Sequence, residues 1–127
     1  MKKLICEIRD GEKSKILEIE NPSLKNCMDA IKEMDGITRS LTAIISEDFS
    51  LTIGGGGGEY IVTCDSENTI KNLLGKSSEN RVVDLTVGGQ ACTYPANYIV
   101  DLYFVKKAIS NEFFDGADQL TWEILNK

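Results

Sequence analysis

Two glycine-rich segments constrain the fold of this chain more than any other feature of its sequence. One is the run of five glycines at residues 54–58, and the other is the pair Gly88-Gly89 directly after residues 83–87. Each follows a stretch in which apolar and polar residues alternate, as they do in strands. Glycine pairs after such stretches are typical of tight hairpin turns. The two segments therefore predict neighbouring strands that are joined directly and run antiparallel.

The rest of the pattern adds further strands and two helices. Apolar residues recur at helical spacing over residues 24–34 and 99–113. We expect the first helix to begin at residues 21–23 and end at Gly36, and the second to be capped by Asn97 and closed by Gly116. We expect strands at 4–9, 15–19, 41–45, 49–53, 60–64, 83–87, 90–94 and 120–125, with one helical turn over 69–74. The sequence thus predicts a single domain over residues 1–127 with an α+β fold, in which a mostly antiparallel sheet carries two helices on one face.

The charge of the chain is concentrated in its middle. Twenty acidic and 14 basic residues give a net charge of −6, and residues 47–101 hold eight of the acidic residues but only three basic ones. An acidic surface repels nucleic acid and attracts basic partners. We therefore expect no direct binding to nucleic acid. The longest apolar runs, such as residues 102–105, are too short to span a membrane, so we also expect no membrane partner.

The sequence offers little material for catalysis. It has no histidine, no paired nucleophile and no C-x-x-C pair among its four cysteines. We therefore predict no catalytic residues, no metal and no cofactor. Each cysteine has apolar neighbours, which favours buried, reduced thiols.

Residues 1–6 begin like a signal peptide, but Glu7, Arg9 and Asp10 interrupt the pattern, so we expect a cytoplasmic protein.

The glycine run does not have the form of a phosphate-binding loop. Gly58 is followed by Glu59 and a strand-like segment, whereas a phosphate loop opens into a helix and avoids a neighbouring carboxylate. We interpret the run as a flexible hairpin connection that is longer than a tight turn requires. Such a loop leaves room for a partner to approach the backbone.

The candidate binding residues lie beside the two glycine segments. Asp84 falls on the face opposite Val83, Leu85 and Val87, so it is expected to be exposed. Tyrosine, glutamine and carboxylate side chains together suit a polar binding surface with aromatic anchors, although Tyr94 and Tyr98 are equally suited to covering a sheet edge. The predicted binding set is Glu59, Tyr60, Asp84, Gln90, Tyr94, Tyr98 and Asp101. The predicted structural set is Gly54, Gly55, Gly88, Gly89, Pro95 and Trp122, with Trp122 in the core.

Read in order, these pieces resemble the family-one immunity proteins of bacterial polymorphic toxin systems. The resemblance covers roughly residues 41–123. It consists of Leu51-x-Ile53-Gly54-Gly55, a strand with Tyr60, Leu74-Gly75, Val83-x-Leu85-x-Val87-Gly88-Gly89-Gln90, Tyr94-Pro95, a helix with Ala108, the pair Phe113-Phe114, Gly116 and a strand with Trp122.

The resemblance implies an α+β domain that binds a cognate secreted toxin inside the cell and blocks its active site. The partner would be the C-terminal domain of that toxin, often a nucleic-acid deaminase or a nuclease. Of the two hallmark residues of the family, Trp122 matches the tryptophan, and Glu59 is our choice for the glutamate. An acidic inhibitor can mimic nucleic acid and steer its association with such a toxin, so we expect the surface of residues 47–101 to face it.

The sequence is also compatible with two other classes of function. The first is a small-molecule-binding α+β domain with the glycine loop as its lid, which predicts a closed apolar pocket. The second is an enzyme that runs on carboxylates such as Asp84, Asp101 and Glu123, on tyrosines or on a cysteine. The oligomeric state is open as well, because exposed sheet edges can pair.

Overall fold

The computed structural model describes all 127 residues. Its α-helices are α1 (Leu24–Lys32) and α2 (Leu102–Phe113), and a short 3-10 helix spans Ala96–Tyr98. Its strands are β1 (Lys3–Asp10), β2 (Lys13–Glu20), β3 (Leu41–Ile45), β4 (Phe49–Gly56), β5 (Glu59–Ser66), β6 (Thr69–Leu73), β7 (Val82–Val87), β8 (Gln90–Pro95) and β9 (Trp122–Asn126).

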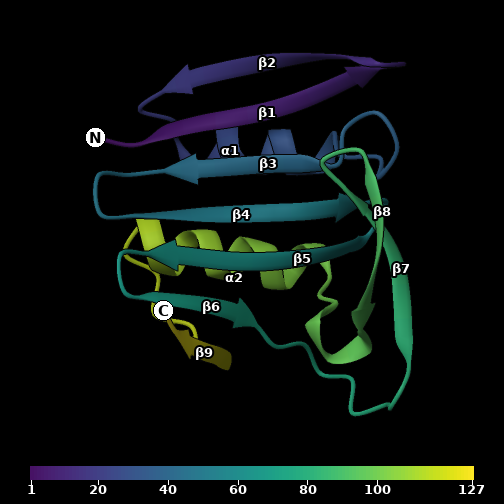
Figure 1. Ribbon diagram of the computed structural model, residues 1–127. Coiled ribbons are helices and arrows are strands. Elements are labelled where there is room, and N and C mark those ends of the chain that lie inside the picture. Colours follow the sequence, from purple (N-terminus) through teal and green to yellow (C-terminus); the bar gives the residue numbers. More distant parts are fainter.

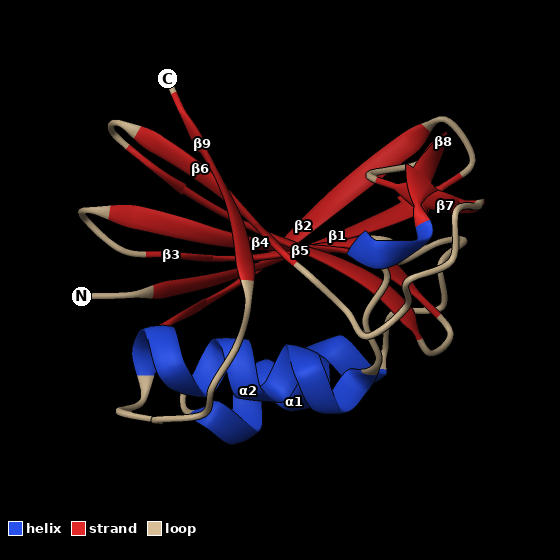
Figure 2. Ribbon diagram, turned by 90° about the horizontal axis from the view of Figure 1, so that it is seen from below, coloured by secondary structure: helices blue, strands red, loops and turns tan.

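Seven of the strands form one antiparallel sheet in the order β2-β1-β3-β4-β5-β6-β9 (Figure 1). Both α-helices lie on the same face of this sheet (Figure 2). The predicted α+β class with the helices on one face is therefore confirmed. The hairpin β7–β8 stands apart as a two-stranded sheet across one end of the larger one. We call the face without helices the open face.

The hydrophobic core lies between the sheet and the two helices. It is one cluster of 16 buried residues, because alternate positions of the central strands point toward the helices. Examples are Leu51, Ile53 and Val62, which are almost inaccessible to solvent. Ile31 of α1 and Ile109 of α2 meet them from the other side. Burying each such side chain contributes about 1.5–3 kcal/mol to folding.

The start of α1 follows its sequence signals more closely than its end does. The Ser23 hydroxyl accepts a hydrogen bond from the Asn26 N–H at 3.1 Å, and the Asn26 side chain accepts one from the Ser23 N–H at 3.0 Å. This reciprocal pair satisfies two N–H groups at the helix start. The helix ends at Lys32, before the predicted end at Gly36. Met34 is nevertheless buried, as its place in the apolar stripe predicts.

The glycine run is not the long loop that the sequence predicts. Residues 54–56 belong to β4, and only Gly57 and Gly58 connect it to β5. Both turn residues have positive φ, as do Gly88 and Gly89 in the second hairpin, which fits the tight turns predicted for glycine pairs.

Close backbone approach explains the glycine at position 56. A Cβ there would lie 2.3 Å from the Gly36 nitrogen, so the loop after α1 can only touch β4 at a residue without a side chain. The Gly57 N–H donates to the Met34 carbonyl at 3.0 Å and closes the contact.

Two predictions between residues 65 and 101 were wrong. The predicted helical turn over 69–74 is the strand β6, which pairs with β5 and β9. Asn97 does not cap the second helix, because it lies in the 3-10 helix and its carbonyl accepts a hydrogen bond from Gly75. Asp101 is the N-cap of α2 instead, with its side chain accepting from the Phe104 N–H at 2.9 Å.

The cysteines and the tryptophan are less uniformly buried than the sequence predicts. All four cysteines are free thiols, but Cys92 is exposed on β8 and Cys6 is only partly buried. Burial raises the pKa of the Cys27 thiol to about 11. Trp122 is partly buried at the edge of the core. Neither α-helix has the length and apolar character needed to cross a bilayer.

Candidate functional site

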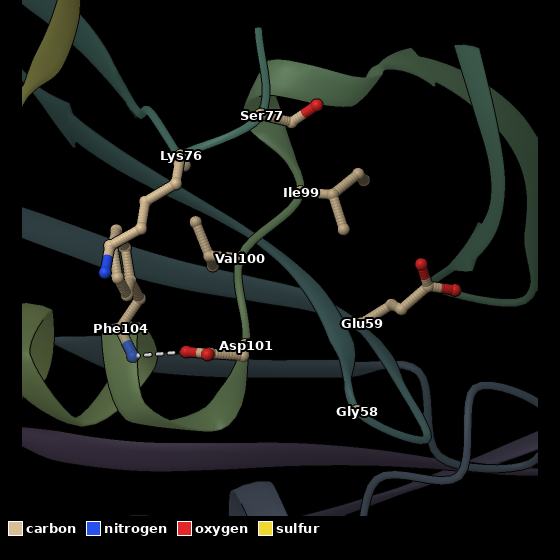
Figure 3. A pocket seen from close by; sticks show the side chains of 9 residues that line it. Gly58, Glu59, Lys76, Ser77, Ile99, Val100, Asp101 and Phe104 are labelled. Carbon is tan, nitrogen blue, oxygen red and sulfur yellow. Dashed lines mark hydrogen bonds between the residues drawn. The ribbon is translucent and has the colours of Figure 1, made fainter. Parts of the chain in front are cut away.

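The turn Gly57-Gly58 separates two grooves at one end of the sheet, and each groove carries two carboxylates. The first groove, with a volume of about 300 Å³, is lined by Glu59 and Asp101 (Figure 3). The second, of about 220 Å³, is lined by Asp35 and Asp84. We call these four exposed residues and the turn between them the glycine-turn surface.

A pair of backbone hydrogen bonds places the carboxylates of the first groove. The Tyr60 N–H donates to the Val100 carbonyl at 3.0 Å, and the Val100 N–H donates to the Tyr60 carbonyl at 2.8 Å. Glu59 and Asp101 each adjoin one member of this pair, at the start of β5 and at the N-cap of α2. The antiparallel bridge therefore holds two carboxylates from distant parts of the chain around the same groove.

One lysine shares the first groove with these carboxylates. The Lys76 Nζ lies 5.7 Å from the centre of the Phe104 ring, on the side of the groove away from Glu59 (Figure 3). Lys76 forms no ion pair with either carboxylate. The ammonium group therefore rests against an aromatic face and leaves both acids available to a partner.

Asp35 in the second groove is ordered by its own loop. Its Oδ1 accepts hydrogen bonds from the N–H groups of Arg39, Ile37 and Thr38 at 2.8–2.9 Å, and its Oδ2 accepts from the Thr38 hydroxyl at 2.8 Å. These bonds favour the charged form and hold the pKa of Asp35 well below its usual value. Asp84 approaches from β7, because the hairpin β7–β8 packs against β4 at this end.

None of the four carboxylates belongs to any of the ion pairs in the structure. They come from four separate segments: the loop after α1, the start of β5, β7 and the N-cap of α2. The arrangement therefore gathers four carboxylates that no ion pair within the chain neutralises.

The acidic segment 47–101 does not form one continuous surface. Because neighbouring strands are antiparallel, the turns β3–β4 and β5–β6 lie at the end of the sheet opposite Gly57-Gly58. Glu47, Asp48, Asp65 and Glu67 therefore lie away from the glycine-turn surface, and Asp65 is paired with Lys127. Only part of the predicted acidic surface can face one partner.

The remaining predicted binding residues separate into different places. Tyr94 and Tyr98 line a smaller hollow of about 160 Å³ between the hairpin and the open face. The Tyr98 hydroxyl hydrogen-bonds to the Glu123 carboxylate, which raises the pKa of Tyr98. Gln90 is exposed beside the turn of the second hairpin. Tyr60 is 3% exposed, so its side chain belongs to the core and cannot contact a partner.

The three carboxylates that the sequence offers to an enzyme lie in different places. Asp84 and Asp101 line different grooves, and Glu123 lies on β9 beside Tyr98. No group of three His, Cys, Asp or Glu side chains is placed to share a metal ion. The first groove mixes charged side chains with Ile99, Val100 and Phe104, so it is not a purely apolar pocket, and a two-residue turn is too short to close over it as a lid.

Asp35 is the site residue that the sequence did not identify. It lies in the electrically neutral N-terminal part of the chain, and the contact of its loop with Gly56 and Gly57 brings it to the glycine-turn surface. An Asp-Gly pair directly after a helical stripe is a turn signal, but it does not indicate which strand the turn will meet.

No protein-family model, curated protein or solved structure matches this chain.

Proposed function

We propose that this chain is an immunity protein that binds and neutralises a cognate secreted bacterial toxin, a nucleic-acid deaminase or nuclease. The observation that carries the proposal is the glycine-turn surface, with four carboxylates that have no cationic partner within the chain. The resemblance of residues 41–123 to family-one immunity proteins supports the same function. Its partner is the C-terminal domain of the toxin, and its place of action is the cytoplasm.

The chemistry of such a toxin suits an acidic partner. An enzyme that acts on nucleic acid presents basic residues to the phosphates of its substrate. Unpaired carboxylates on an inhibitor attract those residues, accelerate association and occupy the surface that the substrate needs. Glu59 and Asp101 on one side of the turn and Asp84 on the other would make these contacts. Asp35 orders its own loop through backbone hydrogen bonds and adds to the negative electrostatic potential of the surface.

The test is the association of this protein with its cognate toxin domain, measured by calorimetry and stopped-flow kinetics. The test variant combines Glu59→Gln, Asp84→Asn and Asp101→Asn, which remove three charges while keeping similar shapes. We expect association to slow by roughly tenfold and to become less sensitive to salt.

The matched control removes the same number of charges at the opposite end of the sheet. It combines Glu47→Gln, Asp48→Asn and Glu67→Gln, none of which forms an ion pair. We expect its association rate to stay close to that of the unmodified protein. Equal slowing by both variants would reject the glycine-turn surface as the contact, and the absence of any complex with a folded toxin domain would reject the function itself.

A further inference from the structure

Strand β2 forms a free edge of the sheet. It pairs only with β1, and no other element of the chain lies along its outer side (Figure 1). All eight residues of β2 are exposed, with Ile16 at 58%, Leu17 at 40% and Ile19 at 41%. The opposite edge, β9, has five residues. A long exposed edge that carries apolar side chains is a template for an additional strand.

The hairpin register identifies which backbone groups of β2 are free. Asp10 and Lys13 face each other across a two-residue turn. The pair next to such a turn is hydrogen-bonded, and hydrogen-bonded pairs alternate with non-bonded ones along an antiparallel ladder. Ser14, Ile16 and Glu18 therefore direct their N–H and C=O groups outward, where they are available to a new strand.

The charge along β2 distinguishes between the two possible orientations of that strand. The first half carries Lys13 and Lys15, and the second half carries Glu18 and Glu20. An antiparallel copy of the same strand brings the lysine half of each beside the glutamate half of the other, whereas a parallel copy brings like charges together. The lysines and glutamates point to opposite faces, so they do not form contact pairs. They attract each other across the sheet, within the Debye length of about 8 Å.

We propose that the occupant of this edge is a second copy of the chain, paired antiparallel through β2 about a twofold axis at Ile16. Residues opposite each other in such a pair point to the same face, so a symmetric pair sets Ile16 against its own copy and Ser14 against Glu18. This register places the most exposed apolar side chain of the edge against its twin. The sheet then continues from one copy to the other, with both helix layers on the same side.

The test is sedimentation equilibrium of the full chain over a wide range of concentration. We expect a monomer–dimer equilibrium in the micromolar range, because strand addition buries a small interface. Ile16→Lys should weaken self-association at least tenfold. The matched control is Ile124→Lys on β9, where Ile124 is 60% exposed on the opposite edge of the sheet. This control should leave self-association unchanged, and melting curves should show that both variants fold.

A charge exchange tests the contribution of the lysine and glutamate halves. One variant combines Lys13→Glu with Lys15→Glu, and the other combines Glu18→Lys with Glu20→Lys, so that each carries a single sign along β2. Glu18 also pairs with Lys3 at 3.5 Å, but both side chains are about half exposed, so losing that pair has little effect on folding.

Each charge variant alone should associate more weakly than the unmodified protein, and an equimolar mixture should form a mixed dimer. A monomer at all concentrations, a dimer that Ile16→Lys does not weaken, or a mixture that stays monomeric would each overturn the proposal. The proposal is independent of the toxin, so these outcomes do not bear on the proposed function.

Discussion

Val87 of β7 lies directly over Gly54 of β4. A Cβ at Gly54 would be 2.7 Å and 2.8 Å from the two methyl carbons of Val87, closer than real side-chain atoms approach. This contact seats the hairpin β7–β8 on the open face, and the Gly89 N–H adds a 3.0 Å hydrogen bond to the buried Ser40 hydroxyl. The position of Asp84 in the glycine-turn surface therefore depends on the absence of a side chain at residue 54.

Gly54→Ala should lower the free energy of unfolding by about 1–3 kcal/mol, because the added methyl group overpacks the contact with Val87. The measurement is urea denaturation followed by circular dichroism. Adding Val87→Ala provides space for the new methyl group, so the double variant should be more stable than the sum of the two single effects predicts. Strict additivity would mean that the hairpin shifts freely and that Gly54 does not fix its position.

The sequence predicted best those elements whose pattern is local. Strands β4 and β5 alternate apolar and polar residues, and their buried side chains, such as Leu51 and Val62, follow that alternation. Strand β3 does not, because it buries Thr42 and Ile44 instead of the alternating Leu41, Ala43 and Ile45. Strand β6 was mistaken for a helical turn, since Thr69-Ile70-Lys71-Asn72-Leu73 is short and mostly polar. It is a strand because β5 and β9 pair with it on either side, and β9 is some fifty residues away in the sequence.

The candidate site was predicted only in part, because its four carboxylates meet through long-range contacts. Glu59, Asp84 and Asp101 were identified from composition and motif, but the sequence did not show that they flank one turn. Asp35 was missed, since it joins the others through long-range backbone contacts of its loop with Gly56 and Gly57. Tyr60 was wrongly included, because it alternates with Val62 and Cys64 and shares their buried face of β5.

Asp35 makes stability depend on pH in acid. Its folded-state pKa lies below the value of about 3.9 in an unfolded chain, so its ionised form stabilises the fold. That contribution is fully present above about pH 4 and is lost as the pH falls toward the lower folded-state pKa. Asp35→Asn, which keeps the shape but removes the charge, should therefore be less stable than the unmodified protein near neutral pH.

Urea denaturation of both proteins at several pH values measures this effect. The difference in unfolding free energy between them should narrow as the pH falls below about 4, because protonation removes the same charge from the unmodified protein. A difference that stays constant with pH would show that Asp35 acts through its shape alone.

Trp122 should contribute less to stability than a fully buried tryptophan. It packs at the margin of the core on the edge strand β9, with the Lys71 Nζ 4.9 Å from its ring, and Lys71 in turn meets Glu112 of α2 at 3.3 Å. Trp122→Ala should therefore cost about 2 kcal/mol rather than the 3–5 kcal/mol of a core site. Trp122→Phe, which keeps an aromatic face for Lys71, should cost less, and denaturation of both variants measures the two values. A loss of 4 kcal/mol or more for Trp122→Ala would place the residue in the core proper.

Asp101 has two roles that a single substitution can separate. Its side chain caps α2 by accepting from the Phe104 N–H, and its charge belongs to the glycine-turn surface. Asp101→Ala removes both and should cost about 1 kcal/mol of stability. Asp101→Ser keeps a capping hydroxyl but no charge, so its melting temperature should stay close to that of the unmodified protein while its association with the proposed toxin partner slows. If Asp101→Ser associates at the unmodified rate and only Asp101→Ala slows, then the residue serves the toxin contact by holding the start of α2 in place and not through its charge.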